Sequence, residues 1–311
     1  MSWNPLLEPA YPDAVSLDAI ETLIVPRAVD LGGFEVRRAL PAEQRQMVGP
    51  FIFFDHFGPV DVPAGKGADV RPHPHIGLAT ITYLLLGEVQ HRDSVGSNQI
   101  IRPGDVNWMV AGRGITHSER TPAEARKRPH SAHGIQTWVS LPKAHEDAAP
   151  KFEHHTKETL PVIESDDVRL RLVLGRAYGE TAPASVFSDS FYADVQLSPG
   201  ARIPLPEDHE ERGLYVLEGS VSVAGQSFDS GRMLAFRPKD RIAVAAGPKG
   251  ARLILLGGEP LEGPRYIWWN FVASSREKID AAKEEWRKAD WGCGLFDLPL
   301  GDRDEFIPLP P

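Results

Sequence analysis

Four residues of the types that bind transition metals occur as two spaced pairs in the first half of the sequence. His73 and His75 are two positions apart, and so are His117 and Glu119. Residues i and i+2 of a β-strand point to the same face, so each pair can aim at one point. The 41 residues between His75 and His117 allow several short strands that return the chain to the same place. The spacing therefore predicts a metal site on two strands of a closed β-structure.

The donor set indicates a transition metal rather than a structural zinc ion. Three imidazoles and a carboxylate suit iron, nickel, copper, manganese or zinc. Four protein ligands on an octahedral ion leave two positions open, which binding of a substrate and activation of dioxygen would use. A structural zinc site is usually tetrahedral and rich in cysteine, whereas this sequence has one cysteine, Cys293. A single histidine is more often structural, but two pairs with strand spacing are hard to explain by chance.

Two other histidines of the first half leave two interpretations open. His56 and His91 could donate hydrogen bonds that orient the metal ligands, or they could be polar residues at strand ends. The sequence alone favours the second interpretation.

The segments that must position these residues have the pattern of short strands. Both faces of the run from Thr80 to Leu85 are largely apolar, which predicts a strand covered on each side. Further short apolar runs are separated by Gly and Pro, and a regular series of this kind indicates a sandwich or barrel. Near the end of the chain, residues 274–288 have the apolar spacing of a helix, which we expect to begin with a capping box formed by Ser274 and Glu277.

A polar segment divides the sequence into two similar halves. Residues 143–165 are charged and contain proline, so we interpret them as a linker. We expect an N-terminal metal-binding domain at 1–148 and a C-terminal domain at 149–311, which includes the helix and a Pro-rich tail.

The second half resembles the first, but its residues differ at the metal positions. Pro206 and Asp208 stand where the first half has its first histidine pair, and His209 is one position out of register. A shift of one residue turns a side chain to the opposite face of a strand. We therefore expect the C-terminal domain to lack the metal ligands.

Composition narrows the classes of protein. A chain of 311 residues can form two domains with sizeable cores. Its net charge of −9 argues against direct binding of nucleic acid. The single cysteine forms no intramolecular disulfide and fits a cytoplasmic location. The first residues lack the pattern of a signal peptide, and the apolar runs are too short to span a membrane.

The stretch PHPHIGLATITYLLLGEVQHRDSVGSNQIIRPGDVNWMVAGRGITHSE closely resembles the signature region of the pirins, which are members of the cupin superfamily. The resemblance implies an all-β fold of two jelly-roll (cupin) barrels in one chain, here with a short C-terminal helix. It also implies that the N-terminal barrel holds one divalent metal through His73, His75, His117 and Glu119. Iron(II) is the expected metal, with nickel, copper, manganese, cobalt and zinc as alternatives. The generic cupin motif would have a glutamate at Thr80, and the pirins share this departure.

The resemblance further implies an activity. Several pirins are similar to quercetin 2,3-dioxygenases, which open the ring of a flavonol with O2 and release carbon monoxide. In such an enzyme Glu119 would accept the proton of the substrate hydroxyl, as a general base at or near the metal. The expected partners are then a small aromatic or enolic substrate and O2. The alternative is a regulatory protein without catalysis, whose metal or redox state is sensed by a protein partner.

Overall fold

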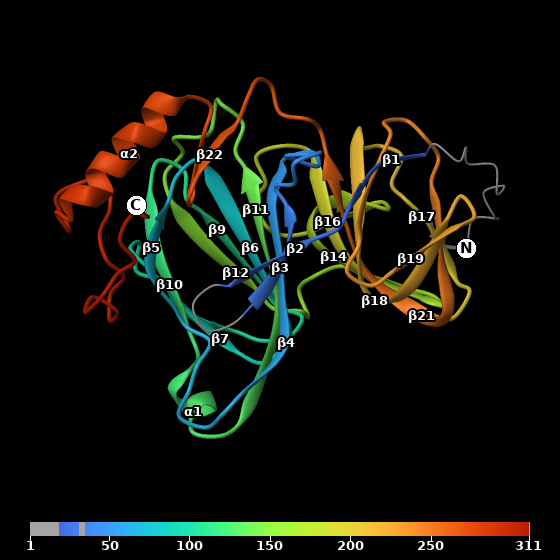
Figure 1. Cartoon of the computed structure of the whole chain (residues 1–311), viewed down its shortest axis with the longest axis horizontal. Coiled ribbons are helices and arrows are strands. Elements are labelled where there is room, and N and C mark those ends of the chain that lie inside the picture. The colour runs from blue at the N-terminus through green and yellow to red at the C-terminus, as the bar shows by residue number, and fades with distance from the viewer. Residues whose placement is uncertain (1–18, 31–34, 311) are drawn as a thin grey trace. The chain divides into compact units, whose positions relative to one another are not determined.

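The computed structural model of the chain describes residues 19–30 and 35–310. Over this range the fold is built almost entirely of strands, with two helices, α1 (Ala123–Arg126) and α2 (Arg276–Lys288), as Figure 1 shows. The prediction of an all-β chain with a short C-terminal helix is therefore confirmed. Neither helix has the length and apolar character needed to cross a membrane.

The chain forms two compact units, and each combines segments that are distant in sequence. Within the described residues, unit 1 comprises the chain up to Arg27, Arg37–Ile52 and Glu158–Pro260. Unit 2 comprises the described parts of Ala28–Val36, Phe53–Lys157 and Leu261–Pro311. Helix α2 and the tail thus group with the predicted metal ligands, whereas the sequence prediction assigned them to a C-terminal domain at 149–311. The continuous domains expected from the sequence differ in this respect from the compact units.

Unit 1 is organised around two long antiparallel strands, β18 (Glu211–Val223) and β21 (Ala243–Gly258). The sheet has the order β1-β20-β18-β21-β16-β14-β13, with three short strands paired at its sides. Its core is a cluster of buried aliphatic and phenylalanine side chains. The remaining strands are β1 (Ile20–Ile24), β13 (Val162–Glu164), β14 (Val168–Ala177), β15 (Glu180–Thr181), β16 (Ser190–Leu197), β17 (Arg202–Pro204), β19 (Gln226–Asp229) and β20 (Met233–Phe236).

Unit 2 contains a four-stranded sheet and most of a seven-stranded sheet. The smaller sheet has the order β5-β10-β7-β8, and the larger has the order β12-β9-β6-β11-β4-β3-β2. The smaller sheet consists of β5 (Val70–His75), β7 (Val89–Asp93), β8 (Asn98–Ile101) and β10 (Ile115–Arg120). The larger consists of β2 (Arg27–Asp30), β3 (Glu35–Leu40), β4 (Phe51–Val62), β6 (Leu78–Leu86), β9 (Val106–Val110), β11 (His130–Ser140) and β12 (Lys151–His155).

Strand β6 lies between β9 and β11, and its first seven residues are buried. The predicted strand with two covered faces is therefore confirmed. The chain then turns at Gly87 and Glu88 and enters β7, which belongs to the other sheet. This transfer connects the apolar strand to the sheet that carries the four predicted metal ligands.

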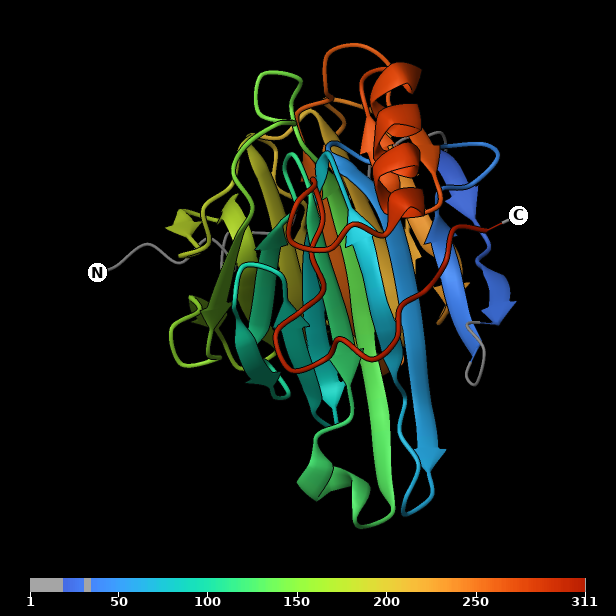
Figure 2. The same cartoon turned by 90° about the vertical axis from the view of Figure 1, so that its left-hand side faces the viewer.

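Helix α2 is fixed to unit 2 by its buried face and by the tail. Ile279, Ala282 and Trp286 are buried in one cluster with Phe271 of β23 (Phe271–Ala273), which pairs with β22 (Tyr266–Trp268). The helix begins one residue later than predicted, because Ser275 is the N-cap and accepts a hydrogen bond from the backbone N–H of Lys278. The tail then crosses the strands of the smaller sheet (Figure 2), where the backbone N–H of Ile307 donates to Pro72 O.

Candidate metal centre

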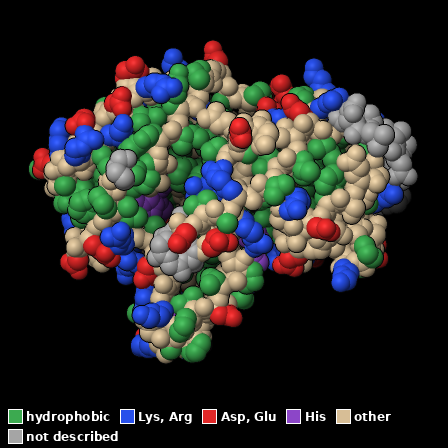
Figure 3. All heavy atoms as spheres, in the orientation of Figure 1, with side chains coloured by type: hydrophobic (Ala, Val, Ile, Leu, Met, Phe, Trp, Pro, Cys, Tyr) green, Lys and Arg blue, Asp and Glu red, His purple; other side chains and the backbone are tan. Residues whose placement is uncertain are grey.

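Adjacent antiparallel strands bring three of the four predicted ligands together. His117 of β10 lies directly opposite His73 of β5, and Ile115 lies opposite His75. The three imidazoles are buried, and each has a nitrogen within 4.8 Å of a nitrogen of the other two. In the space-filling view of one face, histidine side chains appear only as small recessed areas (Figure 3). The two-residue spacing on neighbouring strands thus brings the three histidines together, as the sequence predicts.

Backbone carbonyls fix the orientation of two of these rings. Nδ1 of His73 lies 2.8 Å from Arg71 O, and Nδ1 of His75 lies 3.1 Å from Asn270 O. A carbonyl oxygen only accepts hydrogen bonds, so each Nδ1 carries the proton and each Nε2 keeps its lone pair. Nε2 of His75 lies 3.1 Å from Nε2 of His117. The rings therefore present nitrogen lone pairs toward a common point, as ligands of a metal ion must.

Burial keeps the three histidines in the neutral form that binds a metal. Removal from water lowers the pKa of His73 from 6.5 to about 4. Burial, together with the neighbouring histidines, lowers the pKa of His75 and of His117 well below 6.5. Neutral, pre-oriented imidazoles in a buried cluster fit a divalent transition metal. The residues present therefore fit a divalent transition metal.

Glu119 lies on the same strand as His117, but outside the group of three. Its Oε1 accepts a hydrogen bond of 3.2 Å from the hydroxyl of Thr82, and across the sheet it lies opposite His91 of β7. The side chain is partly buried, and loss of water around it raises the pKa of the carboxyl. A role as fourth ligand stays a prediction.

His91 contacts the predicted ligands, although the sequence favoured a polar residue at a strand end. Its Nδ1 lies 3.4 Å from Nδ1 of His117, and its Nε2 lies 2.9 Å from Oδ2 of Asp93. The ring of Phe152 stacks on the imidazole at 4.4 Å between centroids. His56, by contrast, faces His133, with 2.8 Å between their Nε2 atoms. The sequence feature that could have identified His91 is its two-residue spacing to Asp93. Both residues lie in β7, which neighbours β10.

Sequence reasoning missed two further contacts of the cluster. The rings of Trp138 and His75 meet at a steep angle with 5.1 Å between centroids, and Phe53 stacks on this indole at 3.9 Å. The carbonyl of Asn270 reaches His75 from 195 residues along the chain. Alternation along β11 places Trp138 on one face, but no sequence pattern identifies a backbone carbonyl from so distant a segment.

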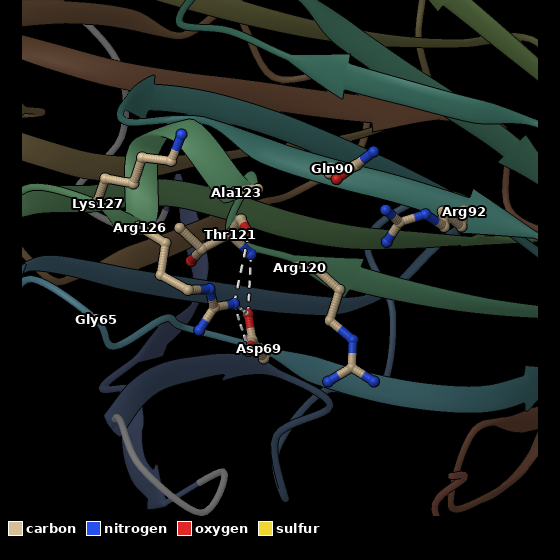
Figure 4. Close-up of a pocket in the computed structure, with 9 residues that line it drawn as sticks. All are labelled: Gly65, Asp69, Gln90, Arg92, Arg120, Thr121, Ala123, Arg126 and Lys127. Atoms are coloured by element: carbon tan, nitrogen blue, oxygen red, sulfur yellow. Dashed lines mark hydrogen bonds and ion pairs between the residues drawn. The ribbon is translucent and has the colours of Figure 1, made fainter. Parts of the chain in front are cut away.

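The opposite face of the same strands carries guanidinium groups around a cavity of about 650 Å³ (Figure 4). Arg92 and Arg120 follow His91 and Glu119 directly, and adjacent residues of a strand point to opposite faces. Arg120 donates two hydrogen bonds to Asp302 of the tail, at 2.8 and 2.9 Å. Arg126 donates to both carboxylate oxygens of Asp69 at 2.7 Å. The sheet therefore separates an imidazole face from a face of paired charges.

Comparison with known families gives two matches along the chain. The pirin family model matches residues 33–139, and the model of the pirin C-terminal cupin domain matches residues 192–292. The first match contains all four predicted metal ligands, and the second lies in the half where the sequence lacks them.

Individual proteins align over nearly the whole chain. A pirin-like protein of Caulobacter vibrioides is 46% identical over 94% of this chain and 99% of its own length. A Pseudomonas aeruginosa protein named "Putative quercetin 2,3-dioxygenase PA1205" is 38% identical over 92% of this chain and 90% of its own. The crystal structure of quercetin 2,3-dioxygenase from Acinetobacter baumannii superposes with a TM-score of 0.85 at 35% identity, covering 93% of this chain and 95% of that one.

Proposed function

The chain belongs to the pirin family, and from this premise we propose that it is a metal-dependent dioxygenase that cleaves quercetin or a similar flavonol with O2. The observation that carries the proposal is the buried cluster of three neutral imidazoles, two of them fixed by carbonyls with Nε2 free. The names of the aligned Pseudomonas and Acinetobacter proteins support the substrate class. The reaction incorporates both oxygen atoms of O2 and releases one ring carbon as carbon monoxide.

Four side chains would hold the metal in this proposal. Nε2 of His73, His75 and His117 would bind directly, and Glu119 would supply a carboxylate oxygen. We propose iron(II), because imidazole and carboxylate ligands with open positions are typical of the iron(II) sites of oxygenases. When bound, the ion would lower the pKa of the flavonol hydroxyl and hold the resulting anion.

Glu119 would also act as the general base. A carboxylate whose pKa is raised by burial is a better proton acceptor near neutral pH than an exposed one. The hydroxyl of Thr82 donates to Oε1, which orients the group and leaves Oε2 to accept the proton of the substrate. Glu119→Gln would retain most of the shape but remove this basicity.

Two stacked aromatic side chains lie next to the cluster. Phe53 and Trp138 stack on each other, and Trp138 borders His75. Aromatic side chains contact planar rings over a large area at low entropic cost. We therefore propose that the flavonol lies against this part of unit 2.

Elemental analysis and aerobic quercetin turnover on the same freshly purified sample test the proposal. Iron at about one ion per chain, with quercetin loss and carbon monoxide release that scale with iron content, is the expected result. The matched variant His73→Ala should lose both, whereas His155→Ala, on the separate strand β12, should retain both. Absence of metal after anaerobic reconstitution would refute the metal centre.

Metal without turnover would favour the alternative, a regulatory protein whose metal state is sensed by a protein partner. The same sample then serves to compare metal-loaded and metal-free protein in binding assays. Loss of quercetin that is independent of metal content would contradict both functions.

A further inference from the structure

His117, the third histidine of the cluster, has a different kind of hydrogen-bond partner from His73 and His75. Nδ1 of His73 and of His75 faces a carbonyl oxygen, whereas Nδ1 of His117 faces Nδ1 of His91 at 3.4 Å. An imidazole nitrogen can donate or accept, so His91 alone does not determine which nitrogen of His117 carries the proton. Another group must set the tautomer of His91.

Asp93 is that group. Its Oδ2 lies 2.9 Å from Nε2 of His91, and the side chain is completely buried. Its Oδ1 accepts the backbone N–H groups of Val95 and Ser97, at 3.0 and 2.9 Å. These two bonds fix the carboxylate in place, so that Oδ2 can only accept from His91.

We propose that Asp93 and His91 form a positioning relay that keeps Nε2 of His117 free to bind the metal. Asp93 accepts a hydrogen bond from the Nε2–H of His91, so that His91 carries its proton on Nε2 and its Nδ1 has a free lone pair. That nitrogen accepts the Nδ1–H of His117, and Nε2 of His117 then presents its lone pair to the cluster. The relay rests on the metal-binding part of the proposed function and is independent of the quercetin reaction.

The position of each residue supports the relay over simple packing. His117 lies directly opposite Asp93 between β10 and β7, and His91 lies on the same face two residues away. The Phe152 ring stacks on His91 and limits its rotation. Carboxylate–histidine–metal arrangements fix the ligand tautomer in many proteins, and here a second imidazole would extend the chain by one step.

Asp93→Asn provides a sharp test because the surroundings determine how the amide must lie. The backbone N–H groups of Val95 and Ser97 require its oxygen at the position of Oδ1. Its NH2 group then faces Nε2 of His91 and donates, which moves the proton of His91 to Nδ1. Two N–H groups now oppose each other between His91 and His117, and the metal-binding tautomer of His117 is disfavoured.

His91→Phe gives the contrasting change. It keeps an aromatic ring against Phe152 but offers His117 neither a donor nor an acceptor. His117 then loses its hydrogen-bond partner at Nδ1, but nothing forces its proton onto Nε2. The relay therefore predicts that the nearly isosteric Asp93→Asn weakens metal binding more than the larger change His91→Phe, whereas a packing role predicts the reverse order.

The experiment measures zinc affinity by competition with a chelator, and histidine tautomers by ¹⁵N-detected imidazole NMR on metal-free and zinc-loaded protein. We expect a loss of about 10–100-fold in affinity for Asp93→Asn and a smaller loss for His91→Phe. In the wild type, His91 should carry its proton on Nε2, and in Asp93→Asn on Nδ1. Glu153→Gln is the matched control, since Glu153 faces His155 at 3.1 Å with the same two-residue spacing, and its affinity should be unchanged.

Three results would overturn the relay. They are a proton on Nδ1 of His91 in the wild type, an Asp93→Asn variant that binds zinc as the wild type does, and a greater loss in His91→Phe than in Asp93→Asn. If Asp93→Asn does not fold, the tautomer of His91 in the wild type decides: a proton on Nε2 supports the relay, and a proton on Nδ1 refutes it. Failure of the wild type to bind zinc would refute the metal site itself, while the tautomer of His91 in metal-free protein still decides the relay.

Discussion

The orientation of the imidazoles in unit 2 depends on the hydrogen-bond partner of Nδ1 as well as on the position of each histidine in its strand. Carbonyls hold His73 and His75, so their Nε2 atoms are pre-oriented before any ion arrives. Such pre-organisation reduces the entropy lost on binding. Each histidine should therefore contribute strongly to metal affinity.

Replacement of a single histidine should remove the metal. His73→Ala or His117→Ala is expected to abolish retention during purification, because two imidazoles remain from the buried group of three. Glu119→Gln should weaken binding less and reduce turnover more, since the amide oxygen can still coordinate but accepts a proton poorly. Elemental analysis checks the first expectation, and full occupancy in His73→Ala protein would refute it.

A buried carboxylate away from the cluster should make stability depend on pH. Glu146 is 3% exposed, and although burial opposes its ionisation, hydrogen bonds from Lys278 and from Ser274 lower its pKa below 4.5. Folding therefore favours the ionised form. The resulting stability is fully present above about pH 4.5 and is lost as the pH falls through the lowered pKa.

Glu146→Gln tests this dependence. We expect a loss of about 1–2 kcal/mol in the free energy of unfolding at pH 7, because charge-assisted bonds become neutral ones and Lys278 is partly exposed to solvent. The difference from the wild type should shrink as the pH is lowered below 4.5. Urea unfolding at several pH values measures it, and a difference that does not vary with pH would contradict the assignment.

At the residue scale, the sequence was most informative where backbone geometry repeats. Two-residue spacing predicted which histidines share a face, and the cluster confirms it. The contacts that orient the imidazoles were harder to predict. Asn270 orients His75 through its backbone carbonyl, and every residue type has a backbone carbonyl. The capping residue was wrong by one position, since Ser274 and Ser275 are equally suitable by type.

At the scale of elements, the strand β23 is hydrogen-bonded to the turn at Ile76 and Gly77, which directly follows His75. Ile76 pairs with Phe271, and the backbone N–H of Val272 donates to Ile76 O at 3.2 Å. Gly77 adopts φ +68°, and a Cβ placed there would lie 2.0 Å from Val272 O. The glycine is therefore required both by its backbone conformation and by the close approach of β23.

Gly77→Ala should separate β23 from this turn. We expect a loss of at least about 1–2 kcal/mol in unfolding free energy from the left-handed backbone alone, and more from the contact with Val272. Metal affinity should fall too, because Asn270 precedes β23 and would move away from His75. Gly65→Ala is a useful control, since its φ of +82° is similar but a Cβ there meets nothing within 4 Å. Equal effects of the two substitutions would exclude a specific role for β23.

The strands themselves were largely predictable, whereas their pairing was not. A run with two apolar faces located β6, and an apolar face located α2. The sequence does not indicate that β6 and β7 belong to different sheets, because the turn at Gly87 and Glu88 is equally compatible with a hairpin. Partner choice depends on long-range packing, which local patterns do not contain.

At the scale of the whole molecule, both units are interrupted in sequence. The expected domains at 1–148 and 149–311 were drawn at a polar segment, where a boundary is usually placed. Within the described residues, the structure instead groups the chain from Leu261 onward with the four predicted metal ligands. The return of a later segment to an earlier unit does not change the local amino-acid composition, so the sequence alone does not predict it.

Truncation after Pro260 should therefore impair the metal centre, although every predicted ligand remains. The shortened chain lacks Asn270, β23, α2 and the tail residue Asp302 that binds Arg120. We expect loss of metal retention and a lower melting temperature for unit 2. Circular dichroism and elemental analysis check this outcome, and wild-type metal content in the truncated protein would disprove it.

The carbonyl of Asn270 also sets an order of events during protein synthesis. All four predicted metal ligands leave the ribosome long before Asn270, and His75 lacks its guide until residues 261–311 have emerged and docked. A nascent chain should thus pass through a period in which its histidines are exposed and unguided. Stable capture of the ion should then require that residues 261–311 have docked, because only then is His75 held by Asn270.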